Sequence, residues 1–426
     1  MEPARDVVIT GLGVVSPIGI GREAFWASLV EGRSGVRSLG WFSASEQPSP
    51  IGGQVPEFDP ARYVRPRKAL KLMSRDIQLA VAAADLACAE AGLAQGTVDP
   101  DRFGVVFGAD MIAADLAELV GAYRACMVDG AFDFRRWGDR ALADLFPLWM
   151  LKYLPNMPAC HVGIIHDARG PNNTLTLAEV SSLAALAEAK EIIQRGQADV
   201  MLAGGASSRI HPTVLLRNAS RQISRCYADP AGACRPFDAD RDGMVFGEGA
   251  AVFVLESRRH AEARGAGAKI LARVLAAACT FEPPREGQLL QGNAIRAAIR
   301  AALAAAAIGP GALGHVNAHG LGTTLDDRVE AQAIREILAD VPVTAPKSCF
   351  GNLGAATGAV ELAASVLALG KGMIPPTRNY HHPAPDCPIR VIHGRLEPAL
   401  RPTALALNHA ASGQAAAIVV AGAVSL

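Results

Sequence analysis

The chain has 426 residues, with 41 Lys and Arg against 41 Asp and Glu, and half of its residues are hydrophobic. This length suits two fused units of about 200 residues with a large core. The balanced charge gives no reason to expect a nucleic acid or an anionic membrane surface as a partner.

The first half begins with a β-branched run, residues 7–13, that ends in glycines and predicts a buried strand. Residues 76–93 carry apolar side chains at the period of a helix that faces a core. Residues 103–108 predict another buried strand. Residues 110–160 are richer in charged and aromatic side chains and have no clean period, which indicates an inserted cap. Residues 180–195 are apolar nearly all round, which predicts a central helix.

The second half repeats this plan. Two segments, 247–255 and 413–421, each run from a glycine turn into a strand and hold matching places, which indicates an internal duplication of an α/β unit. We therefore expect two halves, 1–257 and 258–426, and mainly parallel strands buried on both faces. The other elements predicted here are strands at 198–205 and 269–278, a helix ending at 307, a strand ending near 319 and a helix over 354–369.

Neither a signal peptide nor a membrane span is indicated. The residues from Met1 to Arg5 lack a basic leader segment, and no run of about 18 apolar residues occurs, so we expect a cytoplasmic protein without membrane contact. The eight cysteines form no CxxC pair and have no histidine at ligand spacing, which predicts free thiols and no metal. His381 and His382 could suggest a metal-binding pair. Neighbouring side chains on an extended segment point apart, however, so we expect these two residues to lie in a loop. No cofactor is expected.

Four long segments then point to a family. They are VITGLGVVSPIG at 8–19, CRPFDADRDGMVFGEGA at 234–250, VNAHGLGTTLDD at 316–327, and GPN at 170–172 followed by the central helix and ADVMLAGG at 198–205. In this order they resemble the β-ketoacyl-acyl-carrier-protein synthases of the thiolase superfamily. The resemblance implies a five-layer αβαβα fold and an obligate dimer.

The resemblance also implies a site. In that family a cysteine at the start of the central helix takes the acyl chain as a thioester, and two histidines hydrogen-bond the thioester oxygen. A lysine and a glutamate support the histidines. In this chain the nucleophile position falls on Glu179, the first histidine is His319 and the second histidine position is Asn352. The supporting residues fall on Lys347 and Glu361.

A third part of the family site differs as well. The terminal family segment NSFGFGGTNA, whose Phe-Gly turn completes an oxyanion hole, aligns on NHAASGQAAA at 408–417. Both phenylalanines and two of three glycines are absent. Together with the absent cysteine and second histidine, this predicts that ordinary condensation does not occur.

The leading hypothesis is a non-condensing ketosynthase-like subunit of fatty-acid or polyketide biosynthesis. It resembles in this logic the chain length factors of type II polyketide systems, although those usually carry Gln where this chain has Glu179. The expected partners are an acyl carrier protein and a second subunit, in a homodimer or a heterodimer with an active ketosynthase. In this hypothesis the positive end of the central helix stabilises Glu179, and Lys347 and Glu361 form a buried pair kept for architecture.

Two alternatives stay open. The first is an acyltransferase-type enzyme of altered chemistry, in which Glu179 and His319 act as an acid–base pair on a carrier-bound chain. The second is an ordinary condensing enzyme, which requires another thiol to reach the site. The sequence leaves the acyl chain length and the pathway open.

Overall fold

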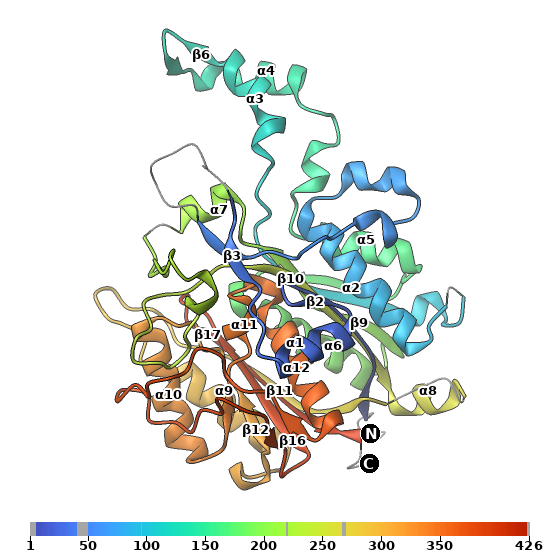
Figure 1. Cartoon of the computed structure of the whole chain (residues 1–426). Helices are drawn as coiled ribbons and strands as arrows, with labels where there is room; N and C mark the ends of the chain where they lie inside the picture. The colour runs from blue at the N-terminus through green and yellow to red at the C-terminus, as the bar shows by residue number, and fades with distance from the viewer. Residues whose placement is uncertain (1–5, 41–49, 95, 219, 266–269, 424–426) are drawn as a thin grey trace.

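The computed structural model describes residues 6–40, 50–94, 96–218, 220–265 and 270–423. The prediction that residues 1–5 hold no basic leader segment concerns residues outside these ranges. Figure 1 shows a body built around a central sheet, with helices on both sides and an arm that projects away from it. No helix in the described ranges is long and apolar enough to cross a bilayer.

The main sheet has eleven strands in the described residues. Its order is β13-β12-β16-β17-β11-β1-β10-β9-β5-β8, with β2 paired to β1. The strands are β1 (Val7–Ser16), β2 (Gly19–Ile20), β5 (Phe103–Ala109), β8 (Asn172–Leu175), β9 (Val200–Ser208), β10 (Glu248–Ser257), β11 (Ala272–Phe281), β12 (His315–Asn317), β13 (Val343–Thr344), β16 (Thr403–His409) and β17 (Gln414–Gly422). Short two-stranded pairs are β3 (Val36–Ser38) with β4 (Ile51–Gly53), β6 (Met127–Val128) with β7 (Ala131–Phe132), and β14 (Met373–Ile374) with β15 (Glu397–Pro398).

The strand order is symmetric about the β1–β11 pair, which joins the two halves. Outward from it, β10, β9, β5 and β8 on one side match β17, β16, β12 and β13 on the other. Both sides have the same directions: the inner pairs are antiparallel and the two outer pairs are parallel. This symmetry agrees with the duplication indicated by the two turn-then-strand segments. The expectation of mainly parallel strands is wrong, because a continuous apolar run reports burial on both faces and carries no information about direction.

The two halves of the sheet form two layers, and the helices supply the three others. Helices α6 (Ser181–Gln194) and α12 (Thr357–Lys371) pack together and contact strands of both halves, so they form the central layer. Helix α2 (Arg75–Ala91) covers the outer face of β1 and β10, and α9 (Asn293–Ala305) covers that of β11 and β17. The remaining helices are α1 (Arg22–Val30), α3 (Leu116–Ala125), α4 (Trp137–Asp144), α5 (Met157–His166), α7 (Pro212–Arg217), α8 (Arg258–Ala263), α10 (Thr324–Leu338) and α11 (Lys347–Phe350).

Helix α10 has no counterpart among the predicted elements. It begins where Thr323 accepts the backbone N–H of Asp326, and Asp326 and Asp327 lie in its first turn. An N-capping threonine with acidic residues in the first turn satisfies the free N–H groups and complements the helix dipole. The start signal is therefore present in the sequence, inside the segment that carries the family resemblance.

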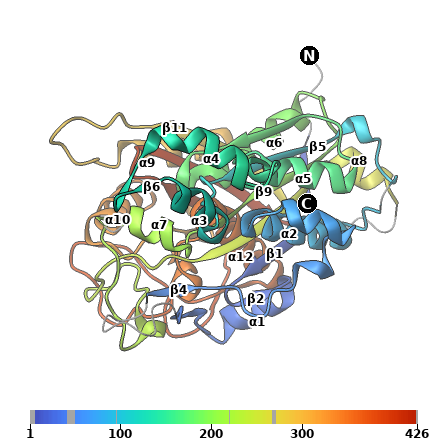
Figure 2. The same cartoon turned by 90° about the horizontal axis from the view of Figure 1, so that it is seen from above.

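The predicted insertion over 110–160 forms the arm. It contains α3, the β6–β7 hairpin and α4 before the chain returns through α5 (Figure 1), and Figure 2 shows α3 and α4 nearest the viewer, in front of the body. Tyr123, Phe132 and Trp137 pack against one another at its tip. Its exposed apolar side chains are Met111, Leu116, Val120, Tyr123, Met127, Val128, Phe132, Phe134, Leu142, Phe146, Leu148 and Met150. So much exposed apolar surface on one projection is typical of a contact with another protein.

Candidate functional site

Glu179 lies in a single 3-10 turn, Ala178–Val180, that leads into the central helix α6. Its side chain is buried, with the residue only 1% exposed. The preceding Ala178 has a φ of 51°, a left-handed conformation that costs energy for a residue with a side chain. The chain thus makes a strained turn at the start of the central helix and places a carboxyl group in the interior there.

Arg209 holds Glu179 in place. Its Nη1 donates to Glu179 Oε1, while its Nε and Nη2 donate to the carboxylate of Asp110 at 2.9 and 3.2 Å. Asp110 and Arg209 directly follow β5 and β9, which are parallel neighbours and therefore end at the same edge of the sheet. Asn352 Nδ2 donates to Glu179 Oε1 at 3.1 Å, and Arg221 Nη1 lies 3.8 Å from the same oxygen.

These partners make Glu179 a firmly ionised group. Burial raises the pKa of Glu179, but the charges of Arg209 and Arg221 and the hydrogen bonds from Arg209 and Asn352 outweigh burial and hold the pKa at about 2. The sequence prediction named only the helix dipole as a source of this stabilisation; the structure adds a direct partner, the guanidinium of Arg209, 30 residues further along the chain. A carboxylate with so low a pKa is a weak general base.

The orientation of Asn352 is fixed by its oxygen. Asn352 Oδ1 accepts the backbone N–H of Gly354 at 3.0 Å and the hydroxyl of Thr357 at 3.1 Å, which turns the amide N–H group toward Glu179. Gly354 itself has a φ of 58°, and a Cβ there would lie 2.0 Å from Asp110 Oδ2. Only glycine leaves room at this position for the carboxylate that holds the arginine.

His319 belongs to a second buried cluster. Its Nδ1 lies 3.2 Å from Lys347 Nζ and 3.0 Å from Asn408 Nδ2, and these two donors also reach the carboxylate of Glu361 at 2.5 and 2.7 Å. Because both neighbours of Nδ1 are donors, the neutral ring accepts there and carries its proton on Nε2. Burial, and then the charge of Lys347, holds the pKa of His319 well below its usual range. The ring is thus a neutral hydrogen-bond donor at physiological pH.

The five residues selected from the sequence fall into these two clusters. Glu179 and Asn352 form one with Arg209, and His319, Lys347 and Glu361 form the other. Burial raises the pKa of Glu361 to about 7, against the lowering effects of Lys347 and Asn408. Among the residues that the structure describes, no hydrogen bond joins Glu179 to His319, although the charge of Arg209 contributes to lowering the pKa of His319.

Of the charged and amide residues in these clusters, Asp110, Arg209, Arg221 and Asn408 were not predicted. Asp110 and Arg209 each follow a predicted buried strand, and a charged residue at the carboxyl end of such a strand is a signal that could have found them. Asn408 lies in the aligned terminal segment and retains the asparagine of the family pattern. Their pairing depends on strand order, which the sequence pattern does not reveal.

Two cysteines lie close to the second cluster. Cys349 lies in α11, and the thiol of Cys234 contacts the backbone oxygen of Lys347 at 3.4 Å. Both are buried, and burial raises the pKa of Cys349 to about 11 and that of Cys234 to about 12. Such thiols stay protonated and are poor nucleophiles, so neither supports the ordinary condensing reaction.

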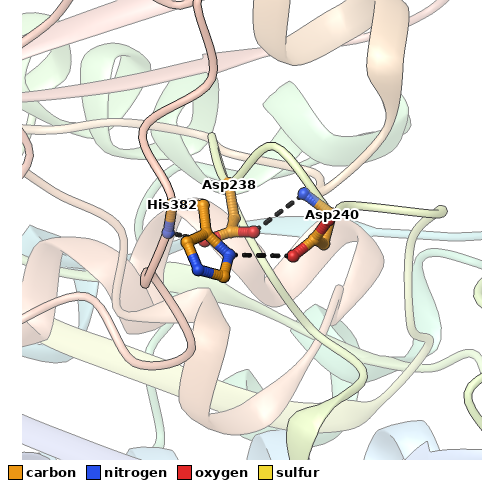
Figure 3. Close-up of side chains that lie close together, drawn as sticks. All are labelled: Asp238, Asp240 and His382. Carbon is orange, nitrogen blue, oxygen red and sulfur yellow. Dashed lines mark hydrogen bonds and ion pairs between the residues drawn. The ribbon is translucent and has the colours of Figure 1, made fainter.

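His382 belongs to a third group, away from these clusters, in which it meets two aspartates (Figure 3). One ligand-type atom from each of Asp238, Asp240 and His382 lies within 4.8 Å of the others. However, Asp238 accepts three backbone N–H groups, from Asp240, His381 and His382, at 2.6 to 2.8 Å. Since both oxygens of Asp238 are thereby engaged, and His382 pairs with Asp240 at 2.9 Å, the group fastens two loops together.

Comparison with known proteins places the chain in a family. The N-terminal domain of beta-ketoacyl synthase matches residues 4–261, and its C-terminal domain matches residues 271–381. The chain belongs to the β-ketoacyl synthase family. Among its relatives, a "Putative polyketide beta-ketoacyl synthase 1" of Streptomyces cyaneus is 34% identical over 98% of both chains. The "3-oxoacyl-[acyl-carrier-protein] synthase 2" of Synechocystis is 31% identical over 92% of both.

Solved structures of ketosynthases share the fold. A β-ketoacyl synthase from Burkholderia phymatum superposes with a TM-score of 0.87 and 29% identity, over 98% of this chain and 99% of that one. AntDE:AntF, described as a type II acyl-carrier protein in complex with its ketosynthase, gives 0.85 and 29% over 99% and 100%. The ishigamide ketosynthase/chain length factor gives 0.83 and 28% over 99% and 100%. The chain therefore has the thiolase fold implied by its sequence motifs.

Proposed function

We propose that this β-ketoacyl synthase family member is a non-condensing subunit of fatty-acid or polyketide biosynthesis that pairs with an active ketosynthase and serves an acyl carrier protein. The observation that carries the proposal is the buried Glu179 carboxylate, neutralised by Arg209, at the start of the central helix. The motif resemblance places the acyl-accepting cysteine of the family at this position. A carboxylate has no sulfur with which to accept the acyl chain as a thioester, and its attack on an acyl thioester would release the thiolate and give a reactive anhydride.

The geometry around the position also opposes catalysis. Oε1 of Glu179 already accepts hydrogen bonds from Arg209 and Asn352, so this oxygen is engaged before any substrate arrives. His319 keeps a neutral ring held by Lys347 and Asn408, as a hydrogen-bond donor in such a site requires. The chain thus keeps His319 and the residues that hold it, but it has no thiol nucleophile beside them for His319 to assist.

The surface supports an assembled state. The arm exposes a row of apolar side chains, and β8 is an edge strand of the main sheet. An unpaired edge together with an apolar projection is stabilised by a second subunit. The solved relatives include a ketosynthase bound to its acyl carrier protein and a ketosynthase/chain length factor, which supports the partners proposed here.

The alternative of an enzyme with altered chemistry has less support. It requires Glu179 to take up a proton during the reaction, and a carboxylate with a pKa of about 2 does so poorly near neutral pH. The pKa of His319 is also held well below its usual range, which makes it a weak base, and the two side chains share no hydrogen bond in the part of the chain that the structure describes.

The test compares the chain alone with the chain in a complex. The purified protein is incubated with acyl and malonyl carrier proteins and analysed by intact-mass spectrometry. We expect no acyl adduct at Glu179 and no condensed product, and a change in product length when an active ketosynthase is coexpressed. The ketosynthase alone is the control. A stable adduct at Glu179, or turnover by the isolated chain, would contradict the proposal.

A further inference from the structure

A polar cavity lies where the start of α2, the base of the arm and the end of β9 meet (Figure 1). Its volume is about 440 Å³, and its lining includes Asp76 of α2, Asp115 at the base of the arm and Ser208 of β9. None of the five site residues selected from the sequence lines it. The cavity is therefore a separate feature from the two buried clusters.

Asp76 is a buried carboxyl group with one oxygen left without a hydrogen-bond partner. The residue is 7% exposed, and its Oδ1 accepts the backbone N–H of Ser208 at 2.9 Å. Among the described residues, no other residue donates to Oδ2 and no cationic side chain forms an ion pair with the carboxyl group. Burial raises the pKa of Asp76 to about 7, and the negative charges of Asp110 and Glu248 add to the rise, while backbone N–H groups oppose it. Asp76 thus faces the cavity without the counterion that a buried carboxylate ordinarily requires.

Two cations line the same cavity, and both already have partners. Arg75 donates through Nε and Nη2 to the two carboxylate oxygens of Glu248, at 3.1 and 2.6 Å. Lys152 pairs with Glu118, which also accepts the hydroxyl of Tyr153 at 2.8 Å. Because each cation is matched by its own carboxylate, neither compensates the charge of Asp76.

The charge that remains in the wall is negative. His211 is neutral at physiological pH, since burial lowers its pKa, and its Nδ1 accepts the backbone N–H of Thr213 at 3.2 Å. Asp115 is exposed, and its Oδ1 accepts the backbone N–H of Ala117 at 2.9 Å. The remaining polar residues of the wall carry no charge. Asp76 and Asp115 are therefore the two charged residues of the wall that no cation balances.

The cavity suits an organic cation better than a metal ion. Leu70, Met73 and Ala113 give one part of its wall an apolar surface, which a hydrocarbon chain can cover. Among the described residues, the group of three side chains close enough to hold a metal lies elsewhere, around Asp238. The volume also falls within the range of about 300–1,000 Å³ that is typical of small-molecule sites.

We propose that this cavity binds an aliphatic primary amine, whose ammonium group pairs with Asp76 and whose hydrocarbon chain lies against the apolar part of the wall. An ammonium group brings three N–H donors and the positive charge that the buried carboxylate lacks. The proposal goes beyond the non-condensing role and does not depend on it, because the cavity is lined by neither Glu179 nor His319.

The test is a calorimetric titration of the full chain with n-butylammonium chloride, and 1-butanol serves as the uncharged ligand of equal size. We expect saturable binding of the amine at millimolar concentration and binding of the alcohol at least about tenfold weaker. In Asp76→Asn the Kd for the amine should rise at least about tenfold, which corresponds to about 1.4 kcal/mol. The amide oxygen of this variant can still accept the N–H of Ser208, so the fold should be kept. The matched control is Asp85→Asn, since Asp85 lies on the same helix and does not line the cavity.

A second variant keeps the test decisive if Asp76→Asn does not fold. Ala113 is half-buried at the base of the arm, so Ala113→Trp should fill the cavity and abolish binding while Asp76 stays in place. Absence of saturable amine binding to the wild type would overturn the proposal. Equal affinity for 1-butanol, an equal loss in Asp85→Asn, or unchanged affinity in either Asp76→Asn or Ala113→Trp would do so as well.

Discussion

Arg209 donates to Glu179 from the end of β9 and in the same conformation holds Asp110, which follows the neighbouring strand β5. The guanidinium therefore lies between two carboxylates in the protein interior. A buried charge is tolerated when its partners are close and its remaining donors are satisfied, and both conditions hold here. We expect from this arrangement that Glu179 has a structural role, which leads to the first prediction.

Glu179→Gln should lower the free energy of unfolding by about 3 kcal/mol. The change leaves Arg209 with a single counterion, Asp110, and breaking a buried pair costs about 3–5 kcal/mol. Chemical denaturation measures the effect. Glu188→Gln, on the exposed side of the same helix, is the control and should cost less than about 0.5 kcal/mol. If Glu179→Gln melts and assembles like the wild type but loses a carrier-dependent activity, the acid–base alternative replaces the silent-subunit proposal.

The contribution of Glu179 should also depend on pH. Its pKa in the folded protein is about 2, lowered from the ordinary value of 4.5. A lowered pKa stabilises the folded state fully above the unfolded value, and this stabilisation is lost as the pH falls through the folded value. The stability difference between wild type and Glu179→Gln should therefore shrink from about pH 4.5 down to about pH 2. Glu188→Gln should show no such trend, and a pH-independent difference for Glu179→Gln would refute the pairing.

Replacing Lys347 and replacing Glu361, which form a buried ion pair, should lower the stability of the protein by different amounts. Burial already raises the pKa of Glu361 to about 7, so after Lys347→Met this carboxyl can become neutral at little cost. Glu361→Leu instead leaves the ammonium of Lys347 without its carboxylate. We expect Glu361→Leu to be the more destabilising change, by at least about 1 kcal/mol in denaturation at neutral pH. Equal losses, or the reverse order, would show that the pair is not held in this way.

Glu179→Cys alone should not restore condensation. The amide of Asn352 cannot take the full role of the second histidine, and the alanines at 410 and 411 do not rebuild the Phe-Gly turn that the family pattern places there. Product formation from acyl and malonyl carrier proteins measures this, with an active ketosynthase as the positive control. A rate near that of the control in the single variant would show that these two losses matter little.

The arm should be required for assembly. Phe134 and Leu142 belong to the arm and are 75% and 87% exposed, and a charge at either position would disfavour burial against another subunit. We expect Leu142→Asp to weaken the dimer in light scattering, and a heterodimer to form preferentially when an active ketosynthase is coexpressed. Leu400→Asp is the matched control, because Leu400 is 79% exposed and lies outside the arm. A wild-type monomer at micromolar concentration would contradict the predicted assembly.

Much of the fold was predictable because its signals are local. The runs at 7–13 and 103–108 became β1 and β5, and the all-round apolar run at 180–195 became α6. Strand direction was not predictable, because the same apolar run suits a parallel or an antiparallel neighbour. The sequence does contain the start signal of α10, a capping threonine followed by an acidic first turn, although no helix was predicted there.

The candidate site residues were predictable only where the chain aligns with the family motifs, whether or not it keeps the family's residue. Glu179, His319 and Lys347 were found by position in motifs, and the structure places each of them in a buried polar cluster. Arg209 and Asp110 were not found, because their importance arises from residues brought close by strand order. No periodicity links residue 209 to residue 179, so only a three-dimensional arrangement reveals that one neutralises the other.

The Glu179–Arg209 contact also limits which substitutions positions 179 and 209 can accept one at a time. Replacing the carboxylate first leaves the buried guanidinium with Asp110 alone, and replacing the arginine first removes the principal partner of a buried carboxylate, each at a cost of about 3 kcal/mol. That cost is a large share of the 5–15 kcal/mol or so by which a folded protein is usually stable. A variant with a thiol at position 179 would need to alter both residues together or pass through a weakened intermediate. The buried ion pair therefore hinders the introduction of a thiol at position 179 even where selection would favour it.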